Sequence, residues 1–153
     1  MTTNEFLTVE ITVDATPEAA FAAINNPRGW WSADIVGDST AVGDEFTYVY
    51  GDIHRSTQRI TELVPGRKVV WHVVEGYLSF TKDTAEWTGT DIVFDITPHG
   101  DKTEVRLTHV GLTPEIECFE ACSKGWGYYV GESLPALILT GTGTPNEPGR
   151  VPA

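Results

Sequence analysis

Hydrophobic and polar residues alternate along much of the chain with a period of two, which is typical of strands that bury one face. The alternation predicts strands over residues 6–13, 45–50, 53–63, 68–75, 91–97 and 103–110. Turn residues separate several of them, as at Gly51-Asp52, Pro65-Gly66 and Pro98-His99-Gly100-Asp101. Residues 81–90 indicate either a loop or an irregular strand. The pattern therefore predicts an antiparallel sheet of about six strands.

Helix signals occur on both sides of this run of strands. Thr16-Pro17-Glu18 predicts a helix start, because Thr can cap, Pro suits the first position and Glu meets the positive end of the helix dipole. Asn25-Asn26-Pro27 ends this short helix, and residues 28–32 add one further turn. Thr113-Pro114-Glu115 repeats the start signal, and the segment from there to about Leu139 predicts the longest helix.

This last helix has an apolar stripe but also carries residues that disfavour a helix. Gly125, Gly127, Gly131 and Pro135 each cost stability inside a helix, and the proline predicts a kink. We expect such a helix to have a close approach or an opening along one side. Because a run of antiparallel strands cannot cover its own apolar face, the helix must lie across the concave side of the sheet. The sequence predicts an α+β domain over residues 1–140, followed by a Gly/Pro-rich tail over 141–153.

Composition narrows the possible partners. The chain has 153 residues, with 10 Lys and Arg against 22 Asp and Glu, which gives a net charge of −12. This acidity disfavours nucleic acid and anionic membranes as partners. Neither a signal peptide nor an apolar run of about 20 residues is visible, so we expect a cytoplasmic protein. No phosphate loop, dinucleotide fingerprint or zinc motif is present, and we expect no cofactor and no metal. Cys118 and Cys122 are interpreted as two small buried groups on one helix face.

Several fragments resemble a known family. They are Val13-Asp14-Ala15-Thr16-Pro17-Glu18, Gly29-Trp30-Trp31, the segment 62–71, Leu107-Thr108-His109-Val110-Gly111-Leu112, and Gly125-Trp126-Gly127-Tyr128-Tyr129 leading to Glu132-Ser133-Leu134. Over about residues 6–140 the chain resembles the START-like (SRPBCC) superfamily, within it the branch named for the activator of the Hsp90 ATPase. The resemblance implies the helix-grip fold of the birch-pollen allergen Bet v 1. Members include ligand carriers, cyclases or dehydratases, stress-response proteins and co-chaperones, and no catalytic residue set is shared.

The candidate ligand-binding residues are those expected on the inner face of the sheet and helix. They are Trp30, Phe46, Tyr48, Gln58, Trp71, Phe94, His109, Trp126 and Tyr129. His109 shares a face with Val105 and Leu107, so it is either a ligand contact or base, or a core histidine with a protein partner. The five tryptophans line a cavity in one interpretation and form ordinary core packing in the other.

A second candidate is the row His54, Ser56 and Gln58. These side chains either place polar groups inside an aromatic pocket or belong to an edge strand that is polar on both faces. Glu62 continues the same alternation and is expected to be half-buried at the end of the pocket.

Three functions follow from these residues. The first is binding of a small, largely apolar molecule between sheet and helix, in a pocket of ~300–1,000 Å³. The second is a cyclase, dehydratase or hydrolase-like enzyme that uses His109 with Gln58 or Tyr48. The third is interaction with a chaperone of the Hsp90 kind, which predicts an exposed apolar patch of roughly several hundred Å².

Overall fold

The computed structural model describes residues 6–145. Its seven strands form one antiparallel sheet in the order β1-β7-β6-β5-β4-β3-β2. The strands are β1 (Leu7–Val13), β2 (Val36–Gly37), β3 (Glu45–Tyr50), β4 (His54–Val64), β5 (Lys68–Leu78), β6 (Asp91–His99) and β7 (Lys102–Val110). The helices are α1 (Pro17–Ile24), α2 (Pro27–Trp30), α3 (Phe119–Tyr128), the π-helix η1 (Tyr129–Ser133) and α4 (Leu134–Thr140).

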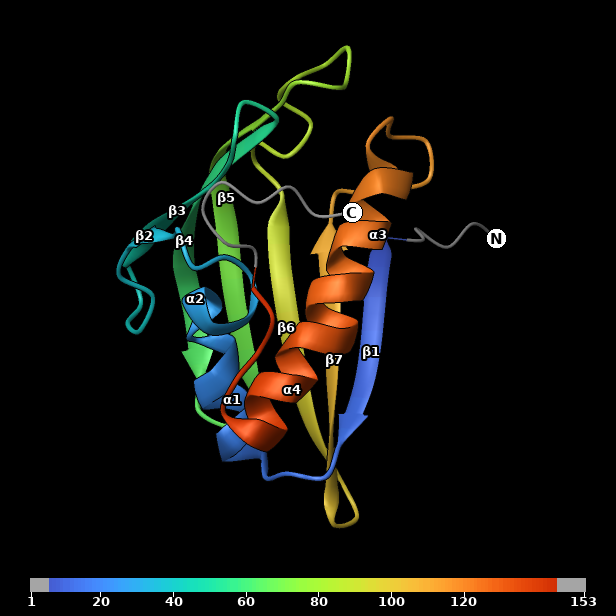
Figure 1. The fold of residues 1–153 in the computed structure, drawn as a ribbon. Coiled ribbons are helices and arrows are strands. Elements are labelled where there is room, and N and C mark those ends of the chain that lie inside the picture. The colour runs from blue at the N-terminus through green and yellow to red at the C-terminus, as the bar shows by residue number, and fades with distance from the viewer. Residues whose placement is uncertain (1–5, 146–153) are drawn as a thin grey trace.

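This architecture confirms the predicted α+β helix-grip fold. The helical segment α3-η1-α4 runs across the concave face of the curved sheet, and α1 and α2 lie beside it (Figure 1). Six strands correspond to those that the alternation predicts. The seventh, β2, has two residues and pairs only with Thr47 and Phe46 of β3, so it is too short to show a period.

The first helix begins where the sequence signal places it, whereas the second begins at Pro27, one residue before the turn expected over residues 28–32. The Thr16 hydroxyl accepts a hydrogen bond from the backbone N–H of Ala19 at 3.1 Å, and Pro17 occupies the first turn. Pro27 begins the four-residue helix α2, which ends at Trp30. Side-chain capping therefore accounts for the start of α1, whereas α2 has a proline in its first turn and no side-chain cap hydrogen bond at Asn26.

The start of the last helix was predicted wrongly. Helix α3 begins at Phe119, and residues 113–118 form turns instead. The Glu86 carboxylate accepts the backbone N–H groups of Glu117 and Cys118, both at 3.1 Å. These donors are thus satisfied by a residue about thirty positions away, which the local signal at Thr113-Pro114-Glu115 cannot show.

Pro135 is accommodated by the π-helix that precedes it. A proline lacks the N–H of a helical residue and its ring crowds the preceding turn, and the wide turn Tyr129–Ser133 relieves both problems. The glycines do not mark a close approach, because a Cβ on Gly125, Gly127 or Gly131 would meet no atom within 4 Å. The expected close approach is therefore absent at these positions of the helix.

The core lies between the sheet and the helices. Ile24, Val69, Leu107 and Leu134 have no solvent exposure, and they come from α1, β5, β7 and α4. Helix α4 ends at Gly141, whose φ of 84° suits glycine. The tail expected over 141–153 lies partly outside the described residues. None of the helices in residues 6–145 has the length and apolarity needed to cross a bilayer.

Candidate functional site

The inner face of β4 carries polar side chains, as the first of the two interpretations proposes. Ser56 and Gln58 are 1% and 0% exposed, and the His54 ring packs edge-on against Tyr48 and Trp87 at 4.9 and 4.4 Å. The inward alternation of β4 does not continue to Glu62, because the pairing with β5 shifts register between Ile60 and Glu62. Glu62 is therefore exposed. The half-buried position expected for Glu62 is therefore wrong, and the cause is a β-bulge.

Buried polar atoms without partners converge on this row. Within the described part of the chain, Gln58 Oε1 and Nε2, Ser56 Oγ, His54 Nε2 and Trp71 Nε1 are buried and form no hydrogen bond. Trp71 belongs to β5 and lies opposite Ile60, one inward position along from Gln58. An unpaired buried polar group costs about 1–3 kcal/mol, so folded proteins retain few of them. We call the four side chains His54, Ser56, Gln58 and Trp71 the polar row.

Aromatic rings cover the polar row. The Trp31 indole stacks on Tyr48 of β3 with centroids 4.4 Å apart and planes 13° apart. It is also nearly parallel to Trp71, at 6.0 Å and 8°. Trp126 and Trp87 contact the same indole at 5.0 and 6.5 Å. The row is therefore enclosed by flat apolar surfaces that offer few polar partners.

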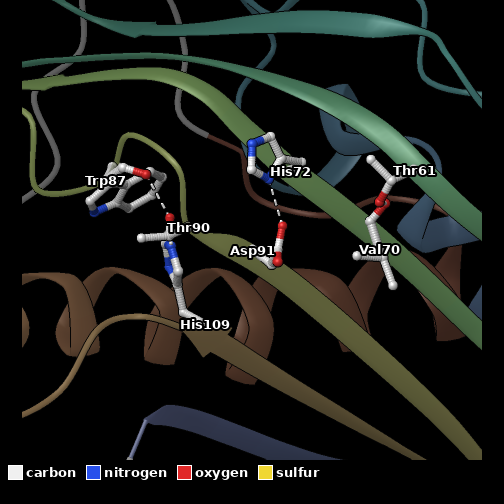
Figure 2. Close-up of polar contacts among 7 residues, drawn as sticks. All are labelled: Thr61, Val70, His72, Trp87, Thr90, Asp91 and His109. Carbon is white, nitrogen blue, oxygen red and sulfur yellow. Dashed lines mark hydrogen bonds and ion pairs between the residues drawn. The ribbon is translucent and has the colours of Figure 1, made fainter.

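His109 has a protein partner on each ring nitrogen (Figure 2 shows its contact with Thr90). The Trp126 indole N–H donates to His109 Nδ1 at 3.1 Å, which requires that Nδ1 carry no proton. The proton is therefore on Nε2, which donates to Thr90 Oγ1 at 2.9 Å, and that hydroxyl donates to the Trp87 carbonyl at 2.6 Å. His109 thus has no free lone pair for a general base, and the geometry favours its interpretation as a core histidine.

Burial also keeps both interior histidines neutral. Burial lowers the pKa of His54 to about 3. Burial, with a smaller contribution from His54, lowers the pKa of His109 to about 3. Burial raises the pKa of Tyr129 to about 12, and a hydrogen bond with Tyr48 opposes this rise. The interior is consequently an uncharged environment at neutral pH, suited to a neutral ligand.

The two cysteines lie at the start of α3, beside this aromatic interior. Cys118 is fully buried and Cys122 is 8% exposed. The Trp87 indole N–H donates to Cys122 Sγ at 3.3 Å. A hydrogen bond from Cys118 lowers the pKa of the Cys122 thiol. No group of three or more His, Cys, Asp or Glu side chains in residues 6–145 is arranged to hold a metal ion.

A groove of about 780 Å³ lies at the β2 end of the sheet, and His54 and Ser56 of the polar row are among the residues that line it. Exposed apolar side chains line it, with Val36 72%, Val49 36% and Tyr77 45% exposed. Asp52, Arg55 and Glu75 add charges of both signs. The alternation of the strands places Val49, Arg55 and Tyr77 on the outer face, away from the helices.

All nine candidate ligand-binding residues lie in the interior, with exposures of 7% or less. They divide into a closely packed group around Trp30, Trp71 and Phe94, and a second group that faces Trp31 and Trp87. Four residues of the site are missing from the nine, namely Trp31, Trp87, His54 and Ser56. His54 and Ser56 belong to the second candidate row, and Trp31 and Trp87 were named only among the five tryptophans. No alternation marks Trp87, because its loop is held by Thr88, whose hydroxyl accepts the Gly76 N–H at 3.0 Å.

Comparisons with known proteins agree with the fold. The chain is similar to the Aha1 dimer from Colwellia psychrerythraea, with a TM-score of 0.71 and 24% identity, covering 90% of this chain and 98% of that one. It is also similar to Mll3558 from Rhizobium loti, with a TM-score of 0.68 and 19% identity, covering 86% and 94%. DynU16, from the dynemicin biosynthetic locus, has a TM-score of 0.67 and 14% identity, covering 92% of this chain and 49% of its own.

The family is shown by sequence. Curated proteins gave no match. A family model described as Activator of Hsp90 ATPase homolog 1-like protein matches residues 14–138. These residues include both short helices, strands β2 to β7 and nearly all of the C-terminal helical segment, whereas β1 precedes them. The chain therefore belongs to the Activator of Hsp90 ATPase homolog 1-like family.

Proposed function

We propose that this protein binds a small, largely apolar molecule with a hydrogen-bonding edge between the inner face of β4 and the helices. The observation that carries the proposal is the polar row, in which four wholly or largely buried side chains hold polar atoms without partners in the described structure. A ligand that donates to Gln58 Oε1 and accepts from Gln58 Nε2 and the Trp71 N–H would satisfy three of these atoms. The rings around them supply apolar contacts.

Ligand pockets commonly combine an apolar lining with a few convergent polar groups that orient the ligand. The interior of this protein has that composition, since Tyr48, Trp71 and Trp126 surround Gln58 and Ser56. Because the nearby histidines are neutral, the ligand we propose is uncharged. Binding, rather than catalysis, is proposed, since both nitrogens of His109 are already engaged.

Native mass spectrometry of the freshly purified protein tests this proposal. We expect a bound species of small-molecule mass that is lost from Gln58→Leu and retained in Thr103→Val. Thr103 is a matched control, because it is equally buried but its hydroxyl already donates to the Ala15 carbonyl at 2.6 Å. The proposal fails if neither a copurified molecule nor any binding from a library of neutral aromatic amides and phenols is detected.

We propose as a second candidate that the outer groove binds a protein, as the family description suggests for an Hsp90-type partner. The observation that favours it is the exposure of Val36, Val49 and Tyr77 around the groove of about 780 Å³. Contiguous exposed apolar surface of this kind commonly marks a binding surface.

Stimulation of ATP hydrolysis by purified Hsp90 tests this candidate. We expect stimulation by the wild-type protein and its loss in the double variant Val49→Ser/Tyr77→Ser, with the outward Thr61→Ser on β4 as the control. The candidate is wrong if the wild-type protein leaves the rate of ATP hydrolysis unchanged. It is also wrong if the double variant stimulates as well as the wild type does.

A further inference from the structure

Trp31 lies where the ring of a ligand would have to lie to reach the polar row. It contacts Tyr48 of β3 and Trp71 of β5, which are the two strands that flank β4. A ring that touches side chains on both neighbours of β4 must lie across the inner face of β4. Ser56 and Gln58 are on that face, with Ser56 directly opposite Tyr48 in the pairing with β3. The indole therefore covers the polar row.

The Trp31 indole does not satisfy the polar atoms of the polar row. It forms no hydrogen bond with Gln58, whose two amide atoms both lack partners, and none with Ser56 Oγ. Its near-parallel orientation to Tyr48 and Trp71 shows that this space accepts a flat bicyclic ring. A planar molecule of the same size with a donor and an acceptor on its edge would retain the stacking and add hydrogen bonds.

Trp31 is also held differently from Trp30 beside it. Trp30 is 0% exposed, packs against Trp71 and Phe94 and has its carbonyl bonded by the Ser133 hydroxyl at 2.7 Å. Trp31 follows the end of α2, and the segment after it forms only the two-residue strand β2 before β3 begins. The chain thus places Trp30 at the end of a helix and Trp31 at the start of the connection to β3, with both indoles buried.

We infer that Trp31 is a displaceable ring that fills the ligand position, and that the ligand is a neutral planar bicyclic molecule whose edge carries both a hydrogen-bond donor and an acceptor. This inference rests on the proposed ligand-binding function. In the closed form the Trp31 indole occupies the space between Tyr48 and Trp71. In the bound form the ligand ring takes that space and its edge pairs with Gln58. Because the ligand binds only to protein in which Trp31 is displaced, the population of the closed form weakens the apparent affinity for the ligand.

Calorimetric titration with indole and indole-3-carboxamide tests this inference. The two probes share a ring of the size of the Trp31 side chain, but only the second carries a carboxamide that complements Gln58. We expect Trp31→Ala to bind indole-3-carboxamide at least about tenfold more tightly than the wild type does, because the competing ring is gone. We also expect Trp31→Ala to prefer the carboxamide over indole by about tenfold, as one or two added hydrogen bonds allow.

Two variants separate this result from simple cavity filling. Trp31→Ala/Gln58→Leu retains the space but removes the amide, and we expect it to bind both probes equally. Phe94→Ala on β6 opens a cavity beside Trp30 and Trp71, and we expect no preference for the carboxamide there. If the alanine variant does not fold, Trp31→Leu replaces it. Equal affinities of wild type and variant, or equal binding of the two probes by Trp31→Ala, would overturn the inference.

A measurement on the wild-type protein distinguishes failure of this inference from failure of the proposed function. With 5-fluorotryptophan incorporated, the ¹⁹F resonance of Trp31, assigned from Trp31→Phe, is expected to shift strongly when a ligand binds, whereas that of Trp30 shifts little. If a ligand binds and the Trp31 resonance does not move, the displacement is wrong while the binding function stands. If no probe binds to the wild type or to Trp31→Ala, both proposals are wrong.

Discussion

Replacement of Gln58 by leucine should make this protein more stable, which is the reverse of what most core substitutions do. The Gln58 side chain is 0% exposed, and neither amide atom has a hydrogen-bond partner in the described residues. Leucine has a similar volume and carries no polar group. The substitution therefore removes two unpaired polar atoms from the interior without opening a large cavity.

The size of this stabilisation follows from the two unpaired amide atoms of Gln58. Each unpaired buried group costs about 1–3 kcal/mol, and part of the gain is lost to imperfect packing of the branched side chain. We expect the free energy of unfolding to rise by about 2 kcal/mol, which corresponds to a rise in Tm of roughly 4–8 °C for a domain of this size. Ligand binding should fall in the same variant, because the amide is the proposed ligand contact.

Urea denaturation at pH 7.5, followed by tryptophan fluorescence, measures the effect. The slope of the unfolding free energy against urea should not change, so that the shift in midpoint reports stability alone. Thr103→Val is the control, and it should lose about 1–2 kcal/mol because it leaves the Ala15 carbonyl without its donor. If Gln58→Leu proves less stable than the wild type in ligand-free protein, the amide is paired in solution and the reasoning about the polar row is wrong.

Three further predictions concern the interior histidines and the glycines. The pKa values of His54 and His109 are about 3 in the folded protein and near 6.5 in the unfolded chain, so the unfolded chain binds more protons between pH 3 and pH 6.5. The free energy of unfolding should therefore fall as the pH drops from 6.5 toward 3, by up to about 1.4 kcal/mol per pH unit for each histidine. Urea midpoints at pH 7, 6, 5 and 4 check this, and His54→Leu should have a shallower dependence; an equal slope would contradict it. His109→Leu should lose about 2–4 kcal/mol in the same assay, since it leaves the Trp126 N–H without its acceptor and Thr90 without its donor; a change below about 1 kcal/mol would argue against the network. Gly127→Ala should raise the free energy of unfolding by about 0.5–1 kcal/mol in thermal unfolding, since the added Cβ meets open space. Gly111→Ala should be destabilised, because Gly111 has a φ of 108° and the added Cβ would lie 2.8 Å from Thr90 Cγ2. The opposite order would refute the placement of the two glycines.

Much of the fold was predictable because its signals are local. The period of two located six strands, and the cap at Thr16 located the first helix, since each signal depends on residues a few positions apart. The signal at Thr113 failed for the opposite reason, because the N–H groups that precede α3 are satisfied by Glu86 in a distant loop. Strand β2 was missed because two residues carry no pattern.

For the candidate site, the sequence by itself determined that Ser56 and Gln58 share one face of β4, since alternation specifies the faces of a strand, but the tertiary structure decided that this face points inward. It also determined that the interior is aromatic. Only the tertiary structure decided which polar atoms find partners: His109 is paired by Trp126 and Thr90, whereas the buried amide of Gln58 has no partner among residues 6–145. The physical reason is that a hydrogen bond requires two groups at a particular distance and angle, and these groups come from segments that only the folded chain brings together.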